Sequence, residues 1–199
     1  MFVLMSQGFF PPTFLVLLYS NSKIIYICRN PMDMFISLWL FTAKLRDNNL
    51  ESLLLDEVFD QIFHGIYANG PFFDHVLGYW KASQENPINI LFLKYKDLKK
   101  DINTHLQNLA IFLGVPFTYD GKKQGVVKKL KEVEVNKKGI HISGVPHKTL
   151  FRKGETGDWS NYLTPSMVER LEKLIQQKLD NSGLAFKLSS RTSKDIVSA

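Results

Sequence analysis

Cysteine is almost lacking in this sequence, with Cys28 as the single one in 199 residues. One thiol cannot form an internal disulfide, so the class of small disulfide-bonded secreted domains is excluded and a cytoplasmic location is expected. Glycine and proline are also few, at 12 and 8 residues, and this excludes collagen-like and low-complexity chains. Hydrophobic residues make up 45% of the sequence, enough for one globular domain with a buried core.

The sequence also lacks a hydrophobic run long enough to cross a membrane. Segment 1–19 is apolar, but residues 6–8 and the two prolines at 11–12 divide it into pieces shorter than the ~18 residues that a membrane helix needs. It is unlike a signal peptide, because no Lys or Arg precedes its apolar part. We therefore expect no membrane partner and interpret residues 1–22 as an atypical lead-in.

Sequence motifs for metal binding and serine hydrolysis are missing. The 5 histidines and the lone cysteine show no metal-ligand spacing, so no metal is expected. No Gly-x-Ser-x-Gly elbow occurs either. Basic residues, in contrast, are in excess: 25 Lys and Arg against 19 Asp and Glu give a net charge of +6. This balance favours an anionic ligand or partner.

Strand and helix patterns alternate along the chain. Residues 23–28 are branched or aromatic, which is typical of a strand buried on both faces of a parallel sheet. Asn30 and Pro31 predict that a helix begins immediately afterwards, and residues 88–95 predict a second strand. Further helices are predicted over 54–66, 73–80, 102–113 and from Thr164 onward. The alternation indicates an α/β fold in which helices flank a parallel sheet.

The lysine-rich stretch 122–138 has no sustained apolar period. We interpret it as a mobile surface segment. Nucleic-acid binding is the alternative, but the stretch lacks the interleaved aromatic residues that stack on bases. No nucleic-acid partner is therefore expected.

The first candidate binding site follows the strand predicted at 23–28. Arg29 stands just before a helix start, where free backbone amides and the helix dipole attract anions. Its guanidinium can bind phosphate through two donors, and Ser37 can donate a hydroxyl from the helical face that it shares with Asp33. These groups suit a phosphate monoester. The structural alternative is that Arg29 pairs with a surface carboxylate while Ser37 bonds to its own helix.

The second candidate is segment 152–159, where Arg152 and Lys153 precede two glycines, the first of which is Gly154. Glycine lets the backbone approach a ligand closely and the two side chains supply positive charge, as in anion-binding loops. The alternative is a solvated turn that Trp159 anchors to the core.

Together the two segments resemble the paired 3′-phosphate-binding motifs of cytosolic sulfotransferases, above all the plant ones. The resemblance is carried by 23–33 with Ser37 and by 152–159, and it extends over most of 23–187. It implies the donor 3′-phosphoadenosine 5′-phosphosulfate (PAPS) and transfer of its sulfuryl group to a hydroxyl of a small organic acceptor. The residues implied to hold the 3′-phosphate are Arg29, Ser37, Arg152, Lys153 and Gly154. Tyr95 is implied to lie against the adenine or to bond it.

The resemblance also implies a domain organisation. Residues 1–22 would be the lead-in, 23–187 a partial sulfotransferase domain with an incomplete P-loop-like parallel sheet, and 188–199 a polar tail. From the family's short dimerisation motif only Thr164 and Glu169 are kept, so a monomer or a weak homodimer is expected.

Two parts of the family pattern do not occur in these 199 residues. The phosphosulfate loop of Lys-Ser-Gly-Thr type is missing, and Gly65 and Gly70, a glycine pair with P-loop spacing, are followed by Pro and Phe instead of Lys and Ser or Thr. The family's histidine base would precede residue 23, whereas the first histidine is His64. No catalytic residue is therefore assigned, and this chain is expected to be inactive or severely impaired. The alternative is a non-catalytic remnant that binds the nucleotide or a partner.

The acceptor class stays open between a flavonoid, a steroid or hormone, and a desulfo-glucosinolate. Four aromatic residues either line a pocket for it or belong to the core: Trp39, Tyr67, Phe72 and Phe73.

Overall fold

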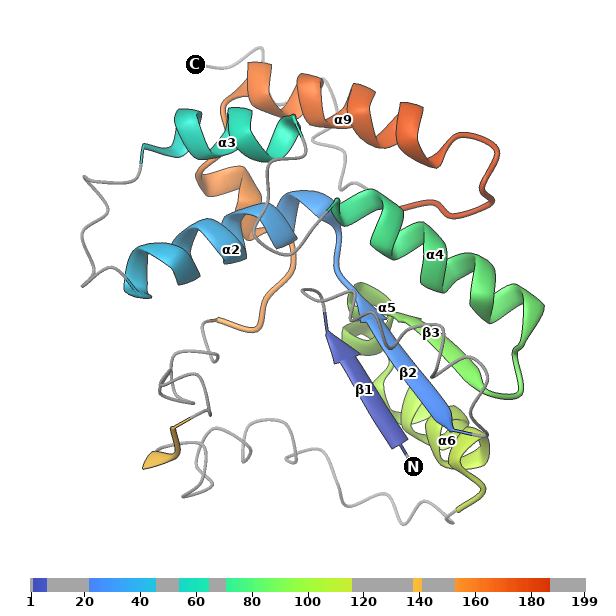
Figure 1. Cartoon of the computed structure of the whole chain (residues 1–199). Coiled ribbons are helices and arrows are strands. Elements are labelled where there is room, and N and C mark those ends of the chain that lie inside the picture. Colours follow the sequence, from blue (N-terminus) through green and yellow to red (C-terminus); the bar gives the residue numbers. More distant parts are fainter. Residues whose placement is uncertain are drawn as a thin grey trace.

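The computed structural model describes residues 2–6, 22–45, 54–64, 71–115, 138–140 and 153–186. Within these ranges three parallel strands form one sheet in the order β1-β2-β3 (Figure 1). The strands are β1 (Phe2–Ser6), β2 (Lys23–Cys28) and β3 (Ile90–Lys94). The α/β class with a parallel sheet flanked by helices is thereby confirmed. Most of the lead-in, the lysine-rich stretch up to residue 137 and the polar tail lie outside the described residues.

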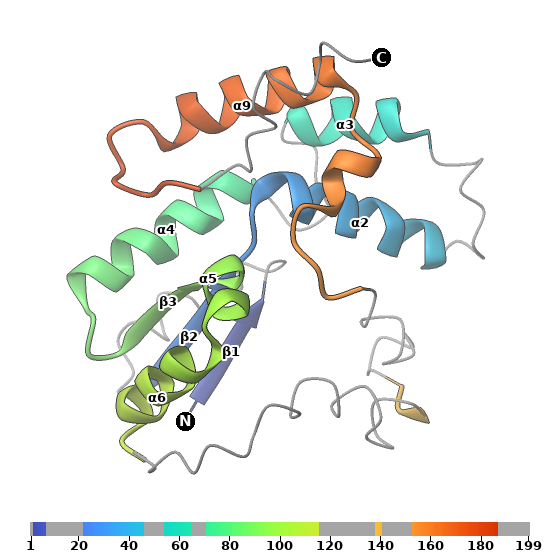
Figure 2. The same cartoon turned by 180° about the vertical axis from the view of Figure 1, so that it is seen from behind.

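Helices cover the sheet and extend beyond the end at which β2 leads into α2 (Figure 1). They are α2 (Pro31–Leu45), α3 (Leu55–Phe63), α4 (Phe72–Glu85), α5 (Tyr95–Lys100), α6 (Ile102–Leu113), the short 3-10 helix η3 (Asp158–Asn161) and α9 (Pro165–Leu179). Seen from behind, α5 and α6 lie in front of the sheet (Figure 2). Helices α2, α3 and α9 form a group of their own past the strands. None of the helices described is long and apolar enough to span a membrane.

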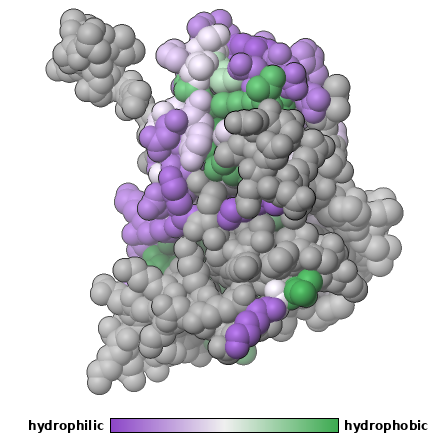
Figure 3. Space-filling model, turned by 90° about the vertical axis from the view of Figure 1, so that its left-hand side faces the viewer, coloured by the Kyte–Doolittle hydropathy of each residue, from purple (hydrophilic) through white to green (hydrophobic). Residues whose placement is uncertain are grey.

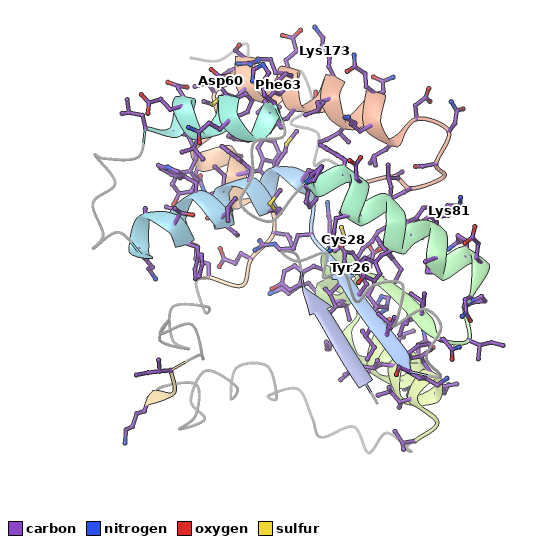
Figure 4. All side chains as sticks on the ribbon, viewed as in Figure 1. Tyr26, Cys28, Asp60, Phe63, Lys81 and Lys173 are labelled. Carbon is purple, nitrogen blue, oxygen red and sulfur yellow. The ribbon has the colours of Figure 1, made fainter. Side chains whose placement is uncertain are left out.

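Strand β2 is the centre of the core, as its hydrophobic sequence predicts. Tyr26 is fully buried and stands opposite Phe92 of β3 in the parallel register. Its ring stacks on Tyr79 of α4 at 4.5 Å between centroids, and its hydroxyl shares a 2.9 Å hydrogen bond with Nδ1 of His75. Figure 4 shows Tyr26 together with Cys28 at the end of β2 that is nearer to α2. Helix α4 is thus fixed to this face of the sheet by aromatic packing.

The start of α2 matches its prediction from Asn30 and Pro31. The Asn30 Oδ1 atom accepts a 2.9 Å hydrogen bond from the Met32 amide, and the Asn30 carbonyl accepts one from Met34. The first bond satisfies an amide that a helix start would otherwise leave without an acceptor, and the second is the first backbone bond of the helix itself. Because Pro31 has no amide hydrogen, it fits the first helical position. The turn between β2 and α2 is therefore well defined, and Arg29 lies in it.

Helix α9 begins as predicted, with the Thr164 hydroxyl accepting a hydrogen bond from the Met167 amide. Its buried face consists of Met167, Leu171, Ile175 and Leu179. Arg170 joins it to α3, because its guanidinium lies over the rings of Phe59 and Phe63 and donates to Asp60 at 2.8 Å. Figure 4 shows Asp60 and Phe63 on α3 close to α9. In the side view, hydrophobic residues (green) lie among hydrophilic ones (purple) at the top of the molecule, the end at which Figure 1 shows α3 and α9 (Figure 3).

Several predicted boundaries differ from the structure: the helix expected over 73–80 runs from Phe72 to Glu85, and the strand expected over 88–95 begins at Ile90. The strand expected over 88–95 ends at Lys94, and Tyr95 begins the unpredicted helix α5. The six residues of α5 carry no apolar period, so the sequence gives no amphipathic signal for it. The helix expected over 54–66 ends at Phe63, and residues 65–70 lie outside the described ranges. Strand β1 lies within the segment interpreted as a lead-in.

Burial of Tyr79 predicts a pH dependence of stability at alkaline pH. Burial raises the pKa of this phenol from 10.0 to about 12. The unfolded chain loses the proton near pH 10 and the folded chain near pH 12, so the stabilisation is complete below pH 10 and is lost as pH rises towards 12. Tyr79→Phe should make the free energy of unfolding, measured with urea from pH 9 to 12, fall less steeply than in the wild type. If the free energy of unfolding fell equally steeply with pH in the variant and in the wild type, this would contradict the prediction.

Candidate functional site

Arg29 is the centre of the candidate site. Its Nη1 atom donates to the Ser37 hydroxyl at 2.7 Å, and its Nη2 atom donates to the Glu155 carbonyl at 2.9 Å. The guanidinium also lies over the ring of Tyr95, 5.1 Å from its centroid. Contacts from α2, α5 and the loop before η3 therefore fix the plane of one guanidinium.

The local fold explains why Arg29 meets Ser37. Arg29 directly follows β2 in the turn that precedes α2, and Ser37 shares a face of α2 with Asp33, four residues before it, as predicted. The hydrogen bond between Arg29 and Ser37 brings the two residues of the predicted binding pair together. The positive end of the α2 dipole lies at the same turn.

Asp33 ties this turn to a distant part of the chain. Its carboxylate is buried, at 3% exposure, and both of its oxygens accept hydrogen bonds from the amide of Gly157, at 3.0 and 2.9 Å. The two residues are 124 positions apart. Gly157 has a φ of +88°, which glycine adopts at low cost. Asp33 thus holds the loop next to Arg29.

The loop of residues 153–157 is held a second time at Gly154. Its carbonyl accepts hydrogen bonds from the Tyr95 hydroxyl at 3.0 Å and from the Lys99 amine at 2.8 Å. Gly154 has a φ of +68°, a conformation that side chains disfavour, and an added Cβ would lie 3.6 Å from the Tyr95 oxygen. The backbone conformation, more than the lack of space, therefore requires glycine here.

Lys153 connects the loop to η3, the 3-10 helix that contains Trp159. The Lys153 amine forms a 2.8 Å ion pair with Asp158, whose side chain is 3% exposed and also accepts a bond from Asn161. Trp159 is buried in the core. Trp159 thus anchors the loop, as the structural alternative predicted, and this anchoring is compatible with a binding role.

The structure brings together four of the six predicted binding residues by direct contact: Arg29, Ser37, Tyr95 and Gly154. Lys153 belongs to the same loop and directly precedes Gly154, but its amine contacts Asp158. Arg152 lies outside the described residues. The sequence analysis missed Lys99, although a spacing of four from Tyr95 would place both on one helical face once α5 is known. It also missed the contact of Asp33 with Gly157.

This arrangement can bind an anion. Arg29 supplies a fixed charge with several N–H donors, Ser37 supplies a hydroxyl, and the start of α2 and the glycine-containing loop supply backbone dipoles. A phosphate monoester needs donors of this kind on several oxygens. In the part of the chain that is described, no group of three or more His, Cys, Asp or Glu side chains could hold a metal ion.

Of the aromatic residues considered for an acceptor pocket, the three that the structure describes do not all line one cavity. Phe72 and Phe73 line a cavity of about 170 Å³ beside α9. Trp39 packs edge-on against Tyr162, with centroids 5.9 Å apart. All three pack against the core, which agrees with the core interpretation, and Tyr67 lies outside the described residues.

Comparison with known proteins places these features in context. Residues 10–183 match the family model described as "Sulfotransferase domain". Cytosolic sulfotransferase 15 of Arabidopsis thaliana is 47% identical over 176 residues, which cover 84% of this chain and 49% of that protein. Flavonol 4′-sulfotransferase of Flaveria chlorifolia is 43% identical, with 84% of this chain and 56% of that protein covered.

A solved structure agrees in fold. The crystal structure of mouse sulfotransferase SULT7A1 complexed with PAP superposes with a TM-score of 0.64 at 30% identity, covering 81% of this chain and 59% of that one. The present chain spans about half the length of the curated relatives it matches.

Proposed function

This chain belongs to the sulfotransferase domain family, and from that premise we propose that the site around Arg29 binds the 3′-phosphate of PAPS. The observation that carries the proposal is the convergence of Arg29, Ser37 and the loop at Gly154 from segments more than 120 residues apart in the sequence. Both motifs that were predicted to hold one phosphate contribute residues to this convergence, which supports the proposal.

The proposed roles follow from the donors available. The Arg29 guanidinium bonds phosphate oxygens, and the Ser37 hydroxyl and the Gly154 amide add neutral donors. Arg152 and Lys153 add positive charge from the loop, and Tyr95 lies against the adenine. Bound PAPS would supply an activated sulfuryl group for transfer to an acceptor hydroxyl. The bonds that Arg29 already makes orient it before the ligand arrives, which reduces the entropic cost of binding.

We further propose that the acceptor is a small organic molecule with a hydroxyl group, of the flavonoid, steroid or hormone, or desulfo-glucosinolate class. Flavonol sulfotransferases are among the similar proteins, which supports the first of these. The 199 residues contain neither the loop lysine nor the upstream histidine of the family pattern. We therefore expect this chain to bind the nucleotide but to transfer the sulfuryl group slowly or not at all.

The proposal predicts discrimination by the 3′-phosphate. Isothermal titration should show adenosine 3′,5′-bisphosphate bound at least about 10-fold more tightly than 5′-AMP, because only the former has the group that Arg29 and Ser37 recognise. Equal affinities would contradict the proposal. A radiolabelled-PAPS assay with phenolic acceptors should give little product compared with full-length relatives, and comparable turnover would overturn the expectation of impaired transfer.

A further inference from the structure

Two side chains of α5 hold the same backbone oxygen of the loop. Tyr95 donates to the Gly154 carbonyl at 3.0 Å and Lys99 donates to it at 2.8 Å. Tyr95 and Lys99 are four residues apart, so they lie on one face of the short helix. Lys100, the next residue, is exposed.

The next carbonyl of the loop reaches the guanidinium. Glu155 accepts from Nη2 of Arg29, so Lys99 and Arg29 bond adjacent carbonyls of one backbone segment. Fixing the Gly154 carbonyl fixes the peptide plane between residues 154 and 155. The Glu155 carbonyl follows this peptide plane in the chain, so the orientation of the plane influences the position of the oxygen that accepts from Arg29.

We propose that Lys99 is a positioning residue of the phosphate site: it orients the Gly154–Glu155 peptide from α5 and thereby sets the orientation of Arg29. The inference rests on the proposed function, because the ligand that Arg29 meets there is taken to be the 3′-phosphate. Lys99 acts through the backbone of the loop, and its effect on binding should depend on whether the ligand carries that phosphate.

Substitution of Lys99 with a matched control tests this role. Lys99→Met should weaken binding of adenosine 3′,5′-bisphosphate by about 5- to 10-fold, the range expected for loss of one hydrogen bond of ordinary strength at an exposed position, and should change 5′-AMP binding by less than about twofold. Lys100→Met removes the same charge from the same helix and should alter both affinities by less than about twofold. Equal effects of the two substitutions would overturn the proposal.

A double-mutant cycle tests whether Lys99 and Tyr95 act on one group. Tyr95→Phe removes only the hydroxyl and keeps the ring beneath Arg29. Because both donors bond one oxygen, the effects of Tyr95→Phe and Lys99→Met on the affinity for the bisphosphate should be clearly non-additive. Additive effects would contradict action through the Gly154 carbonyl.

Hydrogen exchange in the ligand-free protein separates failure of this inference from failure of the proposed function. Lys99→Met should speed exchange of the amides in residues 153–157 at least about threefold, whereas Lys100→Met should leave it unchanged. Unchanged exchange in Lys99→Met overturns the positioning role even if the bisphosphate binds. Equal wild-type affinity for the two nucleotides overturns the phosphate site, and faster exchange in Lys99→Met would then support a role of Lys99 in loop structure alone.

Discussion

Arg29→Met should weaken binding of adenosine 3′,5′-bisphosphate about 100-fold, equivalent to about 2.7 kcal/mol, while 5′-AMP binding changes by less than about threefold. The substitution removes every N–H donor that the guanidinium can offer to phosphate. It also leaves the Ser37 hydroxyl and the Glu155 carbonyl without the partner that they have in the structure. Methionine has a similar length and a flexible apolar chain, so the effect on folding should be small.

A conservative substitution separates charge from shape. Arg29→Lys keeps the charge but can no longer bond Ser37 and Glu155 through two fixed nitrogens, so it should lose about 10-fold in affinity, between the wild type and Arg29→Met. Titration calorimetry with both nucleotides measures these effects. If Arg29→Met weakened the binding of both nucleotides equally, the guanidinium would not recognise the 3′-phosphate specifically.

Asp33→Ala should lower the free energy of unfolding by about 1–3 kcal/mol and weaken binding of the bisphosphate as well. The buried carboxylate accepts the Gly157 amide through both oxygens, and its removal leaves this partly buried donor without its acceptor. The loop then loses one of the attachments that place it beside Arg29. Urea unfolding followed by circular dichroism would measure the change in stability.

The control for Asp33 is Asp74, which also lies in the first turn of a helix. Asp74→Ala removes a similar interaction with a helix dipole from an exposed side chain, so it should cost less than about 0.5 kcal/mol. Equal losses in the two variants would mean that Asp33 acts only on its own helix. In that case the contact with Gly157 would add no stability.

Elements with strong local signals could be predicted from the sequence. The buried residues of β2 and the cap at Asn30 placed the strand, the turn and the start of α2 correctly. The spacing between Asp33 and Ser37 indicated a shared face of α2, and the structure places Ser37 in contact with Arg29. Such signals come from residues within one or two helical turns of each other.

Contacts between distant segments had no such signal. The bond between Asp33 and Gly157 spans 124 positions, and a carboxylate in a first turn is equally well explained by the helix dipole. Helix α5 is polar and only six residues long, so periodicity could not reveal that Lys99 faces the loop. The resemblance to sulfotransferases indicated that the two motifs bind the same phosphate, but it did not identify the residues that hold the loop in place.

The central claim is that Arg29, Ser37 and the loop at Gly154 bind one phosphate group. A crystal structure of the chain with adenosine 3′,5′-bisphosphate tests it most directly. We expect oxygens of the 3′-phosphate within about 3 Å of the Arg29 guanidinium and of the Ser37 hydroxyl. A bound nucleotide whose 3′-phosphate contacts neither of these residues would contradict the account.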